Sequence, residues 1–182
     1  VTDRGLTIGL YAMSSALQEV DEEQILEDIR NLKGSGVDIV VCAFPWGAEG
    51  SFFHTQEQEN LGRAAIDAGA SIVWGHHPHV LQSIEEYNGG IIYYSLGNFA
   101  FGGNDCPRDF DTALISQEVI VDVDGTVSLG QTKAIPCCIS PLDHVNRFQP
   151  TPYEPGTKEY DRAMSKLDGT FKGYDLRVDY DK

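Results

Sequence analysis

The chain has 182 residues and a formal net charge of −15, from 13 Lys and Arg against 28 Asp and Glu. Hydrophobic residues make up 41% of it, which is enough for a globular core and too many for a disordered chain. A surface this acidic repels nucleic-acid phosphates and anionic lipid, so we expect neither as a partner. The longest apolar run, residues 39–44, has six residues and is far short of the ~20 that span a bilayer. We therefore predict no transmembrane segment in this chain.

Strand and helix patterns alternate in the first part of the chain. Residues 6–12 and 37–44 are rich in aliphatic side chains, and the second run is nearly continuous, as in a strand buried on both faces of a parallel sheet. Residues 21–34 and 55–69 have helical apolar spacing, each with an N-cap residue and a glycine stop. Residues 71–74 form a third short strand. This β-α-β-α-β order predicts an α/β fold with a parallel sheet.

Antiparallel patterns follow. Residues 80–87 and 91–95 flank an Asn-Gly-Gly turn, and residues 114–123 and 126–135 flank an Asp-Gly turn, so both pairs predict hairpins. Residues 96–112 form a loop rich in Gly, Asn and Asp. We divide the chain into a domain over residues 1–140 and a Pro-rich extension over residues 141–182, with a short helix at 158–167.

Three of the five histidines lie within four positions directly after the third strand. They are His76, His77 and His79. Ligand sites form where the strands of an α/β sheet end, because the loops diverge there. In an extended segment the two side chains of His77 and His79 point the same way, as imidazoles that share one metal ion would. The alternative is a loop stiffened by proline, with the ring nitrogens bonded to the backbone.

Two motifs resemble the paired signature of a known family. Residues 75–82 (GHHPHVLQ) and 93–99 (YYSLGNF) are similar to those of the CapA-type poly-γ-glutamate capsule-biosynthesis family, which is related to calcineurin-like metallophosphoesterases. Residues 36–41, 46–49 and 66–70 match as well, and the resemblance covers roughly residues 5–135. It implies a two-sheet sandwich flanked by helices, with a metal site at the strand ends.

The resemblance also implies a setting and partners. The family acts outside the bacterial cytoplasm, at the cell surface, in making or exporting an anionic capsule polymer. Its acidic and Asn metal ligands lie in an N-terminal half whose motifs are absent here. We therefore expect this chain to be the C-terminal half of a longer domain, covered by the N-terminal half of the same or a separate chain. An apolar sheet face without cover is the expected sign.

Carried over position by position, the resemblance assigns a zinc or manganese site to this chain. His77 and His79 would be the metal ligands, and His76 is the candidate catalytic residue. Glu49 and Asn98 would line the same pocket, Asn98 through side-chain hydrogen bonds. The remaining candidate, Trp46, forms either a wall for substrate or part of the core.

One position departs from the family pattern. Where the family usually has His-Trp-Gly-x-Glu, this chain has Pro45 in the histidine position. Proline cannot ligate a metal, so we expect weak metal binding and little hydrolysis by this chain alone. Two hypotheses follow: a metal-dependent, phosphoesterase-like hydrolase that needs its other half, or a non-catalytic binding or assembly module. A generic phosphatase would also need the missing ligands.

The four cysteines do not have the spacing of a zinc motif. Cys42 lies in a buried strand and is expected to act as a small hydrophobe. An oxidising compartment permits a disulfide, and we predict that Cys106 pairs with Cys137 or Cys138.

Overall fold

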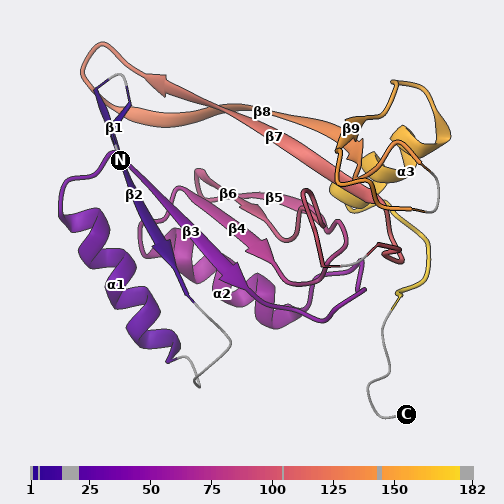
Figure 1. The fold of residues 1–182 in the computed structure, drawn as a ribbon. Coiled ribbons are helices and arrows are strands. Elements are labelled where there is room, and N and C mark those ends of the chain that lie inside the picture. Colours follow the sequence, from indigo (N-terminus) through magenta and orange to yellow (C-terminus); the bar gives the residue numbers. More distant parts are fainter. Residues whose placement is uncertain (1, 4, 14–20, 104, 143–144, 177–182) are drawn as a thin grey trace.

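Two sheets and three helices form the fold of the described residues (Figure 1). The structure is a computed structural model, and it describes residues 2–3, 5–13, 21–103, 105–142 and 145–176. The larger sheet has six strands in the order β1-β2-β3-β4-β6-β5. These are β1 Thr2–Asp3, β2 Leu6–Ala12, β3 Ile39–Pro45, β4 Ile72–His76, β6 Gly90–Tyr93 and β5 Ile84–Tyr87.

The four central strands of this sheet, β2, β3, β4 and β6, run parallel, and β1 and β5 pair antiparallel at its edges. The helices α1 (Glu22–Gly34) and α2 (Gln56–Asp67) lie together on one face (Figure 1). Each begins at a side-chain cap: Asp21 accepts from the backbone of Glu23, and Thr55 forms a capping box with Gln58. Their apolar faces pack on the sheet around a core of fully buried residues that include Ile29, Val40, Phe44, Val73 and Ile92.

The smaller sheet lies over the other face of the larger one (Figure 1). It has the order β7-β8-β9, built from β7 (Asp111–Val121), β8 (Val127–Cys138) and β9 (Thr151–Pro152). Helix α3 (Lys158–Leu167) packs against β7 and β8 through Ala163 and Leu167. An ion-pair cluster joins α3 to the start of β7. The buried Lys166 of α3 lies 2.7 Å from Asp111, the first residue of β7, and 2.8 Å from Asp109, which precedes that strand.

The predicted α/β class and two-sheet arrangement are confirmed. The predicted hairpins at 80–95 and 114–135 also form, although the first arm of the first hairpin begins only at Ile84. The second arm of that hairpin, β6, continues the parallel sheet next to β4, which the sequence pattern did not indicate. The predicted helix at 158–167 coincides with α3, while the domain boundary at residue 140 stays a prediction. No helix of the described segments is long and apolar enough to cross a membrane.

The predicted disulfide is wrong, because the structure holds all four cysteines as thiols. Cys137 is buried and its Sγ donates to the carbonyl oxygen of Ile135, while the Sγ of Cys138 donates to the carbonyl oxygen of Thr151. Burial raises the pKa of the Cys42 thiol to about 12, as expected for a cysteine that serves as a small apolar residue.

Candidate metal centre

Two loops meet where β3 and β4 end, and backbone hydrogen bonds join them. Pro45 and His76 are paired in register at the ends of these parallel strands. The backbone N–H of Trp46 donates to the carbonyl oxygen of His76 (3.1 Å). Further along, the N–H of Gly50 donates to the carbonyl oxygen of Pro78 (2.8 Å). The loop that carries Glu49 is therefore held beside the loop that carries the histidines.

The histidine loop is a left-handed turn and not the extended segment that we predicted. His77 has φ 94° and His79 has φ 60°, values that non-glycine residues rarely adopt. Strained backbone of this kind is found where the surrounding structure holds side chains in a required position. The buried Pro78 lies between the two histidines and is fixed by the bond from Gly50. The turn brings the two rings to a centroid separation of 6.1 Å.

Glu49, His77 and His79, named here the metal group, converge on one point. One ligand atom from each of the three side chains lies within 4.8 Å of the other two. Glu49 and His79 are partly buried and His77 is exposed, so the group opens to solvent on one side. Two imidazole nitrogens and a carboxylate oxygen form a donor set typical of zinc sites that keep a further coordination position open.

Asn98 orients the ring of His79. The Nδ1 of His79 lies 2.6 Å from Oδ1 of Asn98, and Nδ2 of Asn98 donates to the carbonyl oxygen of His79 (3.3 Å). Asn98 is 8% exposed and belongs to the SLGNF motif after β6. A bond of this kind to the distal ring nitrogen commonly fixes the tautomer of a metal-ligating histidine. The side-chain hydrogen bonds predicted for Asn98 are therefore made, both of them to His79, while its part in a functional site stays a prediction.

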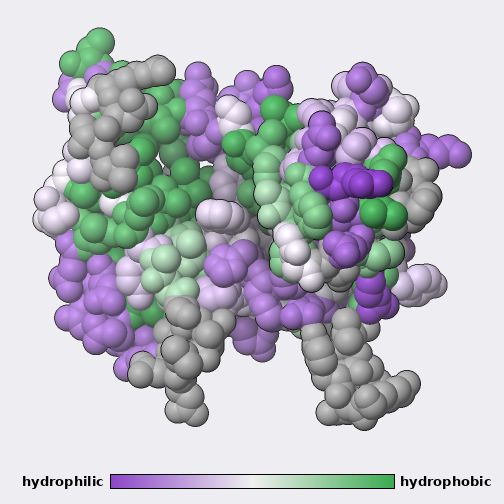
Figure 2. All heavy atoms as spheres, viewed as in Figure 1, coloured by the Kyte–Doolittle hydropathy of each residue, from purple (hydrophilic) through white to green (hydrophobic). Residues whose placement is uncertain are grey.

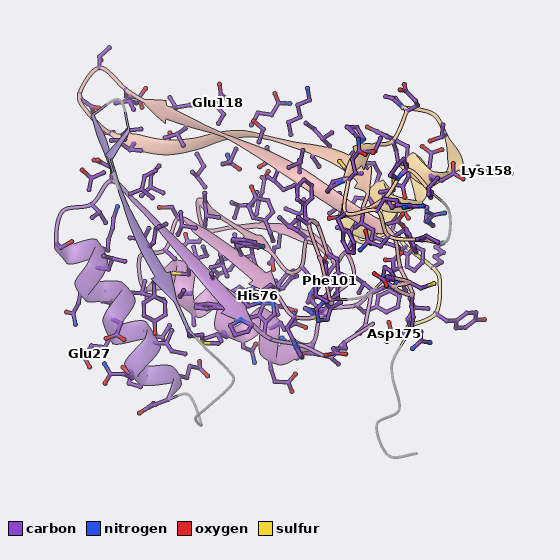
Figure 3. All side chains as sticks on the ribbon, in the orientation of Figure 1. Glu27, His76, Phe101, Glu118, Lys158 and Asp175 are labelled. Carbon is purple, nitrogen blue, oxygen red and sulfur yellow. The ribbon has the colours of Figure 1, made fainter. Side chains whose placement is uncertain are left out.

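A cavity of about 490 Å³ opens beside the metal group. His76, His77 and His79 line it together with Pro45 and Asn98. Figure 3 shows His76 at the end of β4, with Phe101 nearby on the loop that closes the other side. Partial burial lowers the pKa of His76, and the neighbouring His77 and His79 lower it further.

A second cavity, of about 320 Å³, shares His79 and Asn98 with the first and adds Glu49. Arg108 is the one Arg or Lys among the described residues that line the two cavities. Its Nη1 donates to the carbonyl oxygen of Leu176 (2.5 Å). The backbone N–H of Leu176 in turn donates to the carbonyl oxygen of Gly50 (2.7 Å). The segment at Leu176 therefore connects this guanidinium to the Glu49 loop.

Trp46 lies in the core, the second of the two alternatives that the sequence left open. It is 8% exposed, packs against Phe44 and Tyr94, and is absent from the walls of both cavities. Its indole N–H donates to the carbonyl oxygen of Tyr94 (2.8 Å), and both of these groups occupy the space that a side chain at position 75 would need. Any side chain at Gly75 would clash with both groups, so the glycine that begins the histidine motif is required by packing.

Sequence reasoning placed Glu49 in the pocket but did not identify it as a member of the metal group. It missed Arg108 and Phe101 entirely. The Trp-Gly-x-Glu motif was the available signal for Glu49, whereas Arg108 and Phe101 lie in a loop whose path depends on tertiary contacts. Pro45 lies in the cavity wall and is paired in register with His76.

Fold and site together define an α/β domain with a candidate metal centre at the carboxyl ends of parallel strands. The family model of the bacterial capsule synthesis protein PGA_cap matches residues 3–103. The chain therefore belongs to this family.

Curated relatives match 78 to 87 residues of the chain. The capsule biosynthesis protein CapA of Bacillus anthracis is 48% identical over 83 residues, and the PGA biosynthesis protein CapA of Bacillus subtilis (strain 168) is 51% identical over 78 residues. These segments are 46% and 43% of this chain and 20% of each relative. An uncharacterized protein of Sinorhizobium fredii, y4sH, is 36% identical over 87 residues, which are 47% of this chain and 18% of the relative. The matched segments thus span about one fifth of the length of these relatives.

Proposed function

We propose that this chain acts in bacterial capsule biosynthesis and that its metal group binds a divalent ion. The observation that carries the proposal is the convergence of Glu49, His77 and His79 within 4.8 Å. All three lie inside the segment that matches the capsule synthesis family. The names of two relatives, a capsule biosynthesis protein and a PGA biosynthesis protein, support the biological setting.

The donor set fits zinc or manganese. In the tautomer that Asn98 imposes, the Nε2 of His79 has a lone pair available for a metal. Three protein ligands leave room for a water molecule or a substrate oxygen. A bound ion would supply Lewis-acid activation at a phosphoryl or acyl centre. His76, in the wall of the same cavity, is the proposed residue for proton transfer.

An anionic polymer or precursor is the proposed substrate class, in line with poly-γ-glutamate. Arg108 supports this, because it places a guanidinium beside the metal group in a chain of net charge −15. Guanidinium groups bind carboxylates and phosphates through paired N–H donors. We further propose that the protein acts outside the cytoplasm, at the cell surface.

Pro45 favours the second candidate function, a non-catalytic binding or assembly module. It lines the cavity at the position where the family usually has a histidine, and it offers no donor atom. Under this alternative the cavities would bind polymer and the metal group would have a structural role or none.

A chimera tests the proposed function. In the Bacillus subtilis relative, the matched segment is replaced by the corresponding residues of this chain, and capsule polymer is measured in a strain that lacks the natural protein. We expect polymer from the chimera, and loss of polymer from its His77→Ala/His79→Ala variant at equal protein level. Polymer from both proteins would leave capsule biosynthesis standing and favour the binding-module alternative. No polymer from a stably folded chimera would contradict the proposal.

A further inference from the structure

A short segment after α3 lies against the loop that carries Glu49. This segment, residues 170–176, is named here the strap. The backbone N–H of Leu176 donates to the carbonyl oxygen of Gly50 (2.7 Å), and the carbonyl oxygen of Leu176 accepts from Nη1 of Arg108 (2.5 Å). Leu176 lines the second cavity together with Glu49 and Arg108. The end of the strap is therefore one wall of that cavity.

The strap also places a carboxylate against the Glu49 loop (Figure 3). Oδ1 of Asp175 accepts from the backbone N–H of Phe52 (2.9 Å), and Oδ2 lies 3.2 Å from the hydroxyl oxygen of Ser51. That hydroxyl oxygen also lies 2.9 Å from the carbonyl oxygen of Phe53, so its one proton is shared between two acceptors. Hydrogen bonds from neutral donors to an ionised acceptor are short and strong. We name Ser51 and Phe52 the carboxylate notch.

The carboxylate notch is held in place by two buried amide side chains. Nε2 of Gln82 donates to the carbonyl oxygen of Ser51 (2.8 Å), and Oε1 of Gln82 accepts from Nε2 of Gln58 (2.9 Å). All three residues are buried, Ser51 and Gln82 completely. A buried hydrogen-bonded network makes its surroundings rigid. The carboxylate notch is therefore formed by the body of the domain and does not depend on the strap for its shape.

The strap has a firm start and a more exposed end. The backbone N–H of Phe171 donates to a carbonyl oxygen of α3 (2.9 Å), and its ring packs against Phe52 with a centroid separation of 4.9 Å. Further along, Tyr174 is 93% exposed, and Asp175 and Leu176 are only partly buried. Segments with few buried contacts are the ones that open locally. We therefore expect the end of the strap to detach while Phe171 stays in place.

The bonds that hold the strap are those that an acidic amide chain would make. The strap presents a peptide N–H to Gly50, a peptide carbonyl to Arg108 and a carboxylate to the carboxylate notch. Glu49 and Asp109 also line the second cavity, but Asp109 is paired with Lys166 at 2.8 Å. The guanidinium of Arg108 is bonded here to a neutral carbonyl oxygen. A ligand carboxylate would be a stronger partner for it, because both groups are then charged.

We propose that the carboxylate notch and Arg108 form a binding site for a carboxylate-bearing amide chain, and that the strap occupies this site as an internal competitor. The ligand class rests on the substrate class proposed above, whereas the site itself does not require the metal ion. A polar ligand suits this end of the molecule. Figure 2 shows many hydrophilic residues around α3, whereas hydrophobic residues gather where Figure 1 places β2–β4 beneath β7 and β8.

Binding of a γ-linked glutamate oligomer tests the proposal, measured by isothermal titration calorimetry in the presence of EDTA. We expect Asp175→Ala to bind the oligomer about tenfold more tightly than the wild type, the gain that follows if the strap is closed in about nine of ten molecules. Arg108→Ala in the Asp175→Ala background should remove this gain. Glu154→Ala, at an exposed carboxylate outside the strap, controls for the lost charge and should bind like the wild type.

The same oligomer with its carboxylates converted to amides is the matched ligand control, and it should bind the wild type and Asp175→Ala equally. Equal affinity of the wild type and Asp175→Ala for the acidic oligomer would overturn the proposal, and so would no binding by either protein. A gain that persists after Arg108→Ala, or that the amidated oligomer shows as well, would overturn it too, because the strap and the ligand would then not share one site.

The outcome is separable from that of the proposed function. The gain from Asp175→Ala should be the same in the His77→Ala/His79→Ala background, because the carboxylate notch and Arg108 are not ligands of the metal group. A zinc titration without binding, or a chimera without polymer, would count against the proposed function and leave this gain in place. Loss of the gain with zinc binding intact would count against the strap alone.

Discussion

His79 and Asn98 fix each other through two hydrogen bonds. The carbonyl oxygen of His79 can only accept, so the Asn98 group 3.3 Å from it is the amide nitrogen. The amide oxygen then lies 2.6 Å from the Nδ1 of His79, which must donate. Nδ1 therefore carries the ring proton, and Nε2 is left as the ligand atom.

Removing the Asn98 side chain should weaken metal binding while the ligands remain. We expect Asn98→Ala to lower zinc affinity about 10–100-fold, because the ring of His79 loses its orientation and its tautomer. Isothermal titration calorimetry measures this, with Asn60→Ala on the exposed face of α2 as the control. Equal affinities of wild type and Asn98→Ala would show that the bond serves the fold alone.

Gly75→Ala should destabilise the protein by about 3 kcal/mol, because overpacking at a site closed by backbone cannot relax. The new Cβ would clash with the Trp46 indole nitrogen and with the carbonyl oxygen of Tyr94. Gly34→Ala is the matched control, since a Cβ there meets nothing within 4 Å. Urea unfolding measures both, and a stability of Gly75→Ala within the error of the control would refute the packing argument.

Stability toward acid should depend on Asp111. Burial opposes ionisation of its carboxyl, but hydrogen bonds from Arg162 and the charge of Lys166 outweigh burial and lower its pKa. Burial has the larger effect on the neighbouring Asp109 and raises the pKa of that carboxyl despite Lys166. Because the folded pKa of Asp111 is depressed, its stabilising effect is complete above the ordinary carboxyl pKa and is lost as pH falls through the folded value.

We therefore expect Asp111→Asn to cost about 3–5 kcal/mol at neutral pH, where it leaves Lys166 and Arg162 without this partner, and less in acid. Urea unfolding at a series of pH values between neutrality and pH 3 gives the difference between variant and wild type. A difference that stays constant over the whole series would contradict the depressed pKa.

Pro45→His should tighten metal binding. The new imidazole would stand at the end of β3, opposite His76 in register and in the wall of the cavity that contains His77 and His79. A further donor should raise zinc affinity by about tenfold, the equivalent of ~1.4 kcal/mol. Pro45→Ala controls for the change in backbone, and the same gain in both variants would assign the effect to strand geometry.

Local patterns were sufficient to predict much of this fold. The caps at Asp21 and Thr55 marked where α1 and α2 begin, and the apolar run at 39–44 marked a central strand, because these signals depend on neighbours in sequence. The histidine cluster was likewise recognisable from its spacing. The left-handed turn at His77 and His79 was not, because contacts from the Gly50 loop stabilise it.

The features that could not be predicted depend on long-range contacts. Lys166 and Asp111 are 55 residues apart, and no local pattern indicates that they meet. The metal group needs Glu49, and backbone bonds from Trp46 to His76 and from Gly50 to Pro78 hold the loop of Glu49 beside the histidine loop. The expected disulfide was wrong for the same reason: a glycine-rich loop needs no tether when its ends are held by strands, and burial already satisfies Cys137.

Zinc titration of this chain tests the central claim most directly. One ion should bind per wild-type chain, with binding lost in His77→Ala/His79→Ala and strongly weakened in Glu49→Gln, because the three side chains form one donor set. Equal affinity in the wild type and both variants would contradict a metal centre at Glu49, His77 and His79.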